Sequence, residues 1–135
     1  MRGIVAWLVL GLAGLGWTGA TQASPNQCPG ALPRPNTTFG GVVRIVLDGD
    51  TICVSEKPYV KSWIKIRLAD FNAPELDRPG GARAQAALED TALNQRVVCV
   101  SGGRSLDRVM ARCTIEKKNI GAFMRDAGIK QSGDR

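Results

Sequence analysis

Apolar residues follow two patterns along the chain, one long run near the start and then several short runs separated by turn residues. The long run covers residues 4–15 and is broken only by two glycines. In one of the short runs apolar residues alternate with Lys65 and Arg67, as in a strand with one buried face. The β-branched content and the turn residues between runs predict three consecutive strands. These strands cover residues 42–47, 51–54 and 63–68.

A helix, two more strands and a second helix complete the pattern. Residues 82–94 are dense in Ala, Leu, Gln and Glu, which favour a helix. Strands are predicted at 97–100 and 109–115, with a turn over 101–106 between them, and a second helix over 120–127. This order is that of a five-stranded OB-fold barrel, mainly β with helices (α+β), with one helix between strands three and four and one C-terminal helix.

The N-terminal run has the layout of a secretory signal peptide over residues 1–23. It follows a weakly basic start and precedes small residues, and it is shorter than the ~20 apolar residues that span a bilayer. Cleavage is expected after Ala23 or Ala20, and a retained membrane anchor is the alternative. The remaining chain divides into an extended leader, a folded domain and a tail, at residues 24–38, 39–130 and 131–135.

Cysteine content and charge fit an exported protein, either periplasmic or secreted. All four cysteines lie after the predicted cleavage site, and an even count in a small exported domain predicts disulfides. A zinc site is disfavoured because the chain has no histidine and no C-x-x-C pair. The formal net charge of +6 falls to +5 when Arg2 is removed (6 − 1), which suits polyanions such as nucleic acid or wall polymers.

The positions of the cysteines favour one of the three pairings. Cys99 and Cys113 lie on strands expected to be adjacent and antiparallel, and their midpoint falls at residue 106, in the turn region. A Cys99–Cys113 cross-strand disulfide leaves Cys28 to tie the leader to Cys53. The alternative is that one pair stays reduced and packs as small apolar side chains.

Two segments carry the chemistry: residues 47–51 (LDGDT) at the first turn and residues 66–75 (IRLADFNAPE) after the third strand. The first places two carboxylates at one hairpin tip, and hard oxygen ligands of this kind suit Ca²⁺. In the second, Arg67 offers a planar guanidinium for a phosphate, and Glu75 follows a proline that restricts its backbone. Taken singly, each is an ordinary turn or loop residue, and their ordered combination indicates a phosphodiesterase.

These segments resemble the thermonuclease (staphylococcal-nuclease) family, whose usual pattern runs D-G-D-T and then R-L-x-G-I-D-A-P-E. The likeness continues through the first predicted helix to the second and spans about residues 41–129. It implies an OB-fold nuclease that hydrolyses DNA and RNA with Ca²⁺, in which Glu75 is the general base and Arg67 the first phosphate-binding arginine. The implied metal site consists of Asp50, Asn72 and the backbone carbonyl of Ala73, with Asp48 in the surrounding shell.

The chain departs from the family pattern at two places in the site. Asn72 stands where the family has an aspartate, so calcium affinity should drop with the lost charge. Asp70, two residues earlier on the strand, is expected to face the same side by alternation and to compensate for the lost charge. The family's D-R-Y-G-R loop is shortened around Arg108, which is either the second catalytic arginine or a non-catalytic neighbour left by a deletion. We adopt the first alignment.

The sequence therefore predicts a monomeric, Ca²⁺-dependent nuclease acting on DNA or RNA outside the cytoplasm, without stable membrane association after signal cleavage. The rival interpretation is a degenerate barrel that binds nucleic acid or another polyanion without cutting it, and Asn72 together with the short 101–108 loop favours it.

Overall fold

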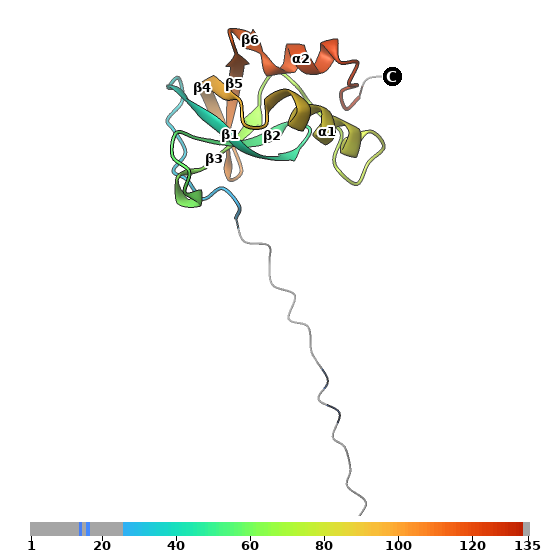
Figure 1. The fold of residues 1–135 in the computed structure, drawn as a ribbon, viewed down its shortest axis with the longest axis horizontal. Coiled ribbons are helices and arrows are strands. Elements are labelled where there is room, and N and C mark those ends of the chain that lie inside the picture. The colour runs from blue at the N-terminus through green and yellow to red at the C-terminus, as the bar shows by residue number, and fades with distance from the viewer. Residues whose placement is uncertain (1–13, 15, 17–25, 134–135) are drawn as a thin grey trace, which may run out of the picture.

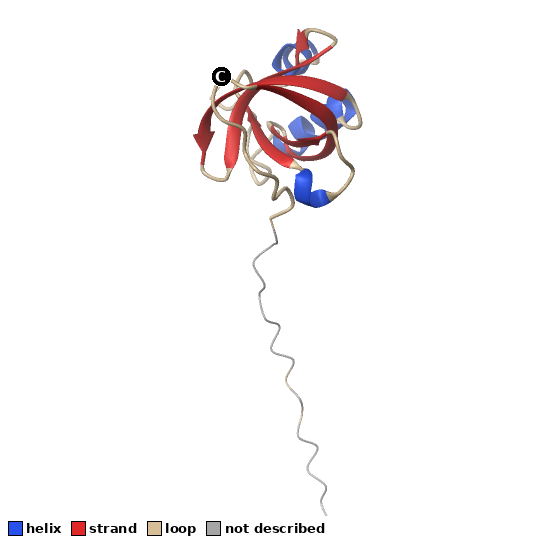
Figure 2. Cartoon of the chain, turned by 90° about the vertical axis from the view of Figure 1, so that its left-hand side faces the viewer, coloured by secondary structure: helices blue, strands red, loops and turns tan. Residues whose placement is uncertain are grey.

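A computed structural model describes residues 14, 16 and 26–133, so the predicted signal peptide lies outside the described residues except at these two positions. Six strands pair in the order β3-β2-β1-β4-β5-β6, and a parallel pairing of β3 with β5 closes the first five into a barrel (Figures 1 and 2). The strands are β1 (Thr38–Asp48), β2 (Thr51–Ser55), β3 (Ile64–Leu68), β4 (Arg96–Ser105), β5 (Arg108–Ile115) and β6 (Lys118–Asn119). The predicted five-stranded barrel of α+β class is confirmed.

Two α-helices lie beside each other against this barrel (Figure 1). Helix α1 (Gly81–Ala92) connects β3 to β4, and α2 (Ile120–Asp126) follows β6. A short 3₁₀ helix, η1 (Val60–Ser62), stands between β2 and β3 and was not predicted. Within the described residues, none of the helices has the length and apolar character needed to cross a membrane.

The core fills the barrel and extends beneath both helices. Each of the five barrel strands contributes fully buried apolar side chains, and so do both helices. The inward side chains of the strands alternate with outward ones, because successive side chains of a strand point to opposite faces. Examples from the strands and helices are Val43, Ile52, Ile66, Val97, Val109, Leu88 and Met124.

Strand β2 is buried along its whole length, and the leader contributes to this burial at Cys53. Cys53 in β2 is bonded to Cys28, and both are almost fully buried. Pro29 pairs with Ile64 at the start of β3, and the Gly30 amide donates to the Trp63 carbonyl over 2.8 Å. The leader is therefore packed against the barrel rather than detached from it.

The second disulfide links Cys99 of β4 to Cys113 of β5, which are direct partners in the antiparallel register. The structure thus contains the same two pairs that the sequence analysis favoured. The predicted turn over residues 101–106 is wrong. Strand β4 continues to Ser105, with a register irregularity between Ser101 and Arg104, and only two residues connect it to β5. Gly102 and Gly103 have no partners in the register, and glycine is rare in regular strands. Residue propensities therefore did not indicate that β4 continues past residue 100.

Candidate active site

The turn between β1 and β2 presents two carboxylates in a fixed arrangement. The Asp50 amide donates to Oδ1 of Asp48 over 2.9 Å, which fixes the tight turn around Gly49. A Cβ atom on Gly49 would lie 2.5 Å from the Cβ of Ala84 and 2.6 Å from that of Ala73. Only glycine therefore allows this turn to pack directly against helix α1 and the segment after β3.

Asp50 is the buried acid of this turn, with 6% of its surface exposed. Its Oδ2 atom accepts a hydrogen bond from the Ala73 amide (2.9 Å) and lies 3.2 Å from Nη2 of Arg67. Burial, together with the neighbouring Asp48 carboxylate, raises the pKa of Asp50 to about 6, although Arg67 and the Ala73 amide act in the opposite direction. A cation beside the Asp50 carboxylate favours its ionised form.

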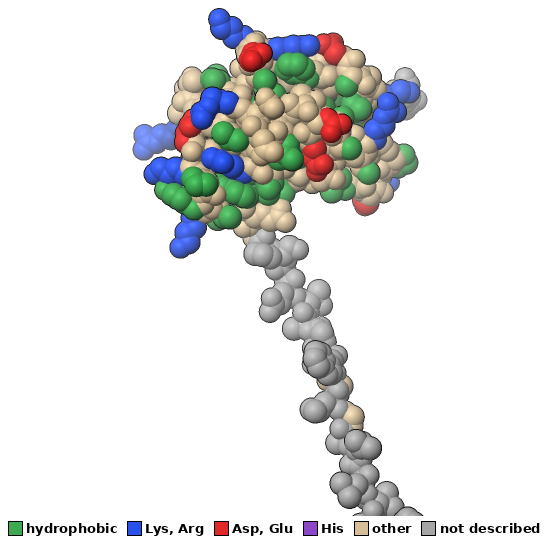
Figure 3. Space-filling view, in the orientation of Figure 1, with side chains coloured by type: hydrophobic (Ala, Val, Ile, Leu, Met, Phe, Trp, Pro, Cys, Tyr) green, Lys and Arg blue, Asp and Glu red, His purple; other side chains and the backbone are tan. Residues whose placement is uncertain are grey.

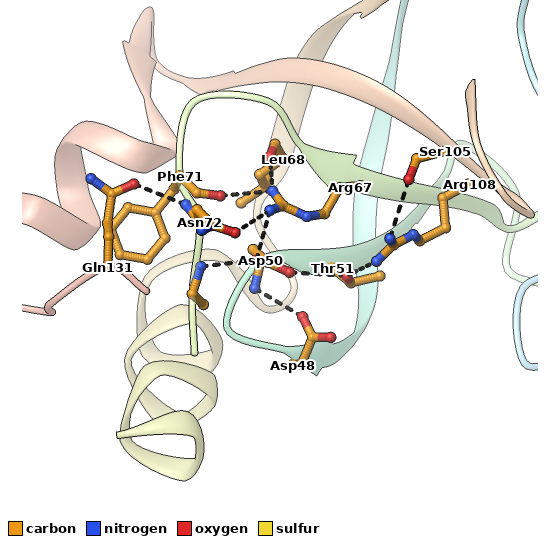
Figure 4. A network of polar contacts seen from close by, with 11 residues as sticks. Asp48, Asp50, Thr51, Arg67, Leu68, Phe71, Asn72, Ser105, Arg108 and Gln131 are labelled. Carbon is orange, nitrogen blue, oxygen red and sulfur yellow. Dashed lines mark hydrogen bonds and ion pairs between the residues drawn. The ribbon is translucent and has the colours of Figure 1, made fainter. Parts of the chain in front are cut away.

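Arg67, on β3, provides that cation and holds the loop that follows its own strand (Figure 4). Nη1 donates to the carbonyl oxygens of Leu68 and Phe71, the latter over 2.8 Å. Nη2 donates to Oδ1 of Asn72 over 2.7 Å and contacts Asp50. The guanidinium therefore joins the turn between β1 and β2 to the loop after β3 through its two terminal nitrogens.

Arg108, the first residue of β5, approaches the same turn from the other side (Figure 4). Nη1 donates to Oγ1 of Thr51 over 3.2 Å, and Nη2 donates to Oγ of Ser105 over 3.4 Å. The Thr51 hydroxyl in turn donates to Oδ1 of Asp50 over 3.3 Å. The structure thus brings Arg67 and Arg108 to residues 50 and 51 from two different strands.

Glu75 stands apart from this network. It is exposed, and its carboxylate has no hydrogen bond or ion pair to any residue in the part of the chain that the structure describes. The residue lines a cavity of about 760 Å³ between the loop that precedes α1 and the segment that follows α2. An unpaired, exposed carboxylate is available to accept a proton from water.

Asn72 connects the site to the C-terminal segment, a link that no local sequence pattern indicated. Its amide donates to Oε1 of Gln131 over 2.9 Å, and its carbonyl accepts from the Ser132 amide over 2.8 Å. Its side chain faces Arg67 at the same time. The described part of the predicted tail over 131–135 therefore packs directly on a residue of the candidate site.

The expectation that Asp70 compensates for Asn72 is wrong. Strand β3 ends at Leu68, so the alternation on which this expectation rested stops before residue 70. The Asp70 carboxylate instead accepts from the Gly121 amide at the start of α2 over 3.2 Å. Its backbone carbonyl accepts from Nη1 of Arg125 over 2.7 Å. Asp70 therefore ties the loop to α2 and is not available to the site.

The ligand atoms available near Asp50 are oxygens, which suit a hard cation, but few of the groups that carry them have a formal charge. Oδ2 of Asp50 and Oδ1 of Asn72 both contact Nη2 of Arg67, so two hard oxygens already converge on one positive charge. Among the described residues, no group of three or more His, Cys, Asp or Glu side chains is placed to hold a metal ion. A metal here would depend on one carboxylate, an amide oxygen, a backbone carbonyl and water.

The fold and site together define an OB-type barrel that carries two carboxylates and two arginines at its first hairpin turn. Over 59 residues the chain is 47% identical to a micrococcal nuclease of Shigella flexneri. The match covers 44% of this chain and 32% of the relative, so the chain spans about a third of that protein's length. No protein-family model matches the chain. The similarity and the five-stranded barrel support the resemblance to the staphylococcal-nuclease family.

Proposed function

We propose that this protein is a nuclease that hydrolyses phosphodiester bonds of DNA or RNA. The observation that carries the proposal is the convergence of Arg67 from β3 and Arg108 from β5 on the acid-bearing turn at Asp50 and Thr51. Two guanidinium groups at one turn can bind a phosphate through several charge-assisted hydrogen bonds. The micrococcal nuclease similarity supports nucleic acid as the substrate.

In the proposed reaction the carboxylate of Glu75 accepts a proton from a water molecule as the water oxygen attacks phosphorus. A new P–O bond forms, the bond from phosphorus to the leaving ester oxygen breaks, and that oxygen is protonated from solvent. Arg67 and Arg108 stabilise the negative charge that accumulates on the phosphoryl oxygens. Glu75 suits its role because its carboxylate is exposed and unpaired among the described residues.

The proposed cofactor is Ca²⁺. Asp50, Asn72 and the Ala73 carbonyl would hold it, with Asp48 in the surrounding shell. The support for this assignment is that Oδ2 of Asp50 and Oδ1 of Asn72 lie close together, at 3.2 Å and 2.7 Å from the same Arg67 nitrogen. When bound, the ion would supply positive charge to offset the negative charge that develops on the phosphoryl group. Because only Asp50 among these three ligands carries a formal charge, we expect weak affinity.

We further propose that the protein acts outside the cytoplasm, in the periplasm or after secretion, as a monomer. The signal-like residues 1–23 and the two disulfides support this location, since disulfides persist in oxidising compartments. After removal of the signal segment we expect no stable membrane association.

Glu75→Gln tests the catalytic assignment, with cleavage and binding measured on the same preparation. We expect cleavage of single-stranded DNA to fall by at least a hundredfold, as for loss of a general base, while affinity changes little. Glu89→Gln, an exposed change of the same kind on α1, serves as the control. Equal cleavage by Glu75→Gln and Glu89→Gln would remove Glu75 from the mechanism.

The second candidate function is binding of nucleic acid without cleavage. The engagement of both terminal nitrogens of Arg67 by protein oxygens, including the neutral Asn72 side chain, favours it. This function predicts that folded wild-type protein binds DNA with steep salt dependence and leaves it intact in the presence of Ca²⁺.

A further inference from the structure

A cavity of about 760 Å³ lies between the loop that precedes α1 and the segment that follows α2. Its charged lining consists of Arg78, Arg83 and Lys130, with Glu75 as the acidic member, and its apolar lining includes Pro79 and Ile129. The volume is that of a site for an organic ligand, and it far exceeds the volume of a single inorganic phosphate. The cavity therefore offers both positive charge and apolar surface to one ligand.

The positive charges of this cavity are not neutralised within the described residues. No hydrogen bond or ion pair joins the side chains of Arg78, Arg83 or Lys130 to another residue that the structure describes. By contrast, Arg96 on β4 is paired with Glu56. With three cations against one acid, the lining carries a formal charge of +2 (3 − 1). Figure 3 shows Lys and Arg side chains on this side of the molecule, near the C-terminal end.

The cavity adjoins the proposed active site through two residues. Glu75, the proposed base, is part of its lining. Asn72 makes hydrogen bonds to Gln131 and Ser132, which belong to the segment that forms the opposite wall, and its side chain contacts Arg67. The cavity is therefore joined to the proposed site through Glu75 and through the contacts of Asn72 with Gln131 and Ser132.

We propose that this cavity binds the nucleotide unit of the substrate strand that flanks the scissile phosphodiester. The flanking phosphate contacts Arg78, Arg83 and Lys130, and the sugar and base pack against Pro79 and Ile129. This inference rests on the proposed function, because it takes the strand at Arg67 and Glu75 as its starting point. If the cavity binds this unit, affinity depends on the length of the substrate. A strand with a flanking phosphate makes contacts in the cavity that a dinucleotide lacks.

The test compares two triple variants with equal loss of charge. Arg78→Gln/Arg83→Gln/Lys130→Gln alters the cavity, and Arg96→Gln/Arg104→Gln/Arg112→Gln alters the β4–β5 side of the barrel. Binding of a fluorescent ten-nucleotide single-stranded DNA is measured by anisotropy, in chelator, at several salt concentrations. The slope of log affinity against log salt should become shallower by about 0.7 in the cavity variant, because its three side chains contact one flanking phosphate and each phosphate neutralised in a single strand contributes about 0.7. The control variant should leave the slope unchanged to within about 0.3.

A dinucleotide provides the second arm of the test, because its single phosphate occupies the scissile position. Its affinity should change less than twofold in the cavity variant. Equal losses in the cavity and control variants, or an equal loss for the dinucleotide and the ten-nucleotide strand, would overturn the proposal. If the triple variant does not fold, each of the three single variants should still weaken binding of the ten-nucleotide strand and leave the affinity for the dinucleotide within about twofold of wild type.

The failure of this inference is distinguishable from failure of the proposed function. If wild-type protein cleaves DNA but both triple variants lose the same affinity, the cavity assignment alone is wrong. If wild-type protein binds without cleaving and only the cavity variant loses affinity, the nuclease assignment is wrong, while the strand still occupies the cavity.

Discussion

Nη2 of Arg67 lies 3.2 Å from Oδ2 of Asp50, and this ion pair is the most buried of those among the described residues. The side chain of Arg67 is 16% exposed and that of Asp50 is 9% exposed. The pair joins strand β3 to the turn between β1 and β2, so it serves the architecture of the barrel as well as the candidate site. Removing either partner leaves the other charge partly buried without compensation.

Arg67→Gln should therefore lower the free energy of unfolding by about 2–4 kcal/mol, measured by urea denaturation in chelator. Arg96→Gln removes an arginine from an exposed pair with Glu56 and should cost less than about 1 kcal/mol. Similar costs for the two variants would show that the contacts of Arg67 with Asp50, Asn72 and the loop carbonyls contribute little to stability.

The pKa of Asp50 predicts an unusual pH dependence of stability. Because burial and Asp48 raise this pKa to about 6, the folded state binds the proton more tightly than the unfolded state does. Stability from this group is therefore highest at low pH and falls as pH rises from about 4 to about 6, by up to about 3 kcal/mol. Urea denaturation of wild type and Asp50→Asn in chelator should show this decline only in the wild type. Parallel curves for the two proteins between pH 4 and 6 would contradict the assignment.

Asn72→Asp should strengthen calcium binding by about tenfold, because it adds a formal charge to a donor set with only one charged ligand at Asp50. Isothermal titration calorimetry measures the affinity without any need for catalytic activity. Asn94→Asp adds the same charge at an exposed position after α1 and serves as the control. Equal affinities for the two variants would remove Asn72 from the metal site.

The two disulfides should each stabilise the folded state substantially. Cys99→Ala/Cys113→Ala opens a link of sequence separation 14 and should cost about 3 kcal/mol, whereas loss of the Cys28–Cys53 link, of separation 25, should cost slightly more. Urea denaturation of each double variant under oxidising conditions gives the cost. Free thiols in the denatured, unreduced wild type would contradict the presence of both bonds.

The parts of the fold that the sequence predicts well are those in which local pattern and tertiary packing agree. Alternation at residues 63–68 identifies β3 because one face of that strand is buried in the barrel. Gly49 and Asp50 form the turn between β1 and β2, directly after Asp48, where the Asp-Gly dipeptide predicted a turn. Cys99 and Cys113 are direct partners because the register irregularity between Ser101 and Arg104 absorbs the one extra residue that β4 has on its side of the turn.

The parts that escaped prediction depend on contacts between distant segments. Gly102 and Gly103 interrupt the apolar pattern, yet β4 continues past them because Arg104 and Ser105 still pair with β5. Asp70 faces α2 because β3 ends at Leu68, so the alternation along the strand does not reach residue 70. The hydrogen bonds from Asn72 to Gln131 and Ser132 join segments 59 or more positions apart, for which no local signal exists.

Cleavage of single-stranded DNA and RNA by oxidised wild-type protein, with millimolar Ca²⁺ or with chelator, tests the central claim most directly. The account predicts cleavage that requires Ca²⁺ and disappears in chelator. Protein that is folded and binds the same strands, but leaves them intact at every calcium concentration, would contradict it and would favour the binding function.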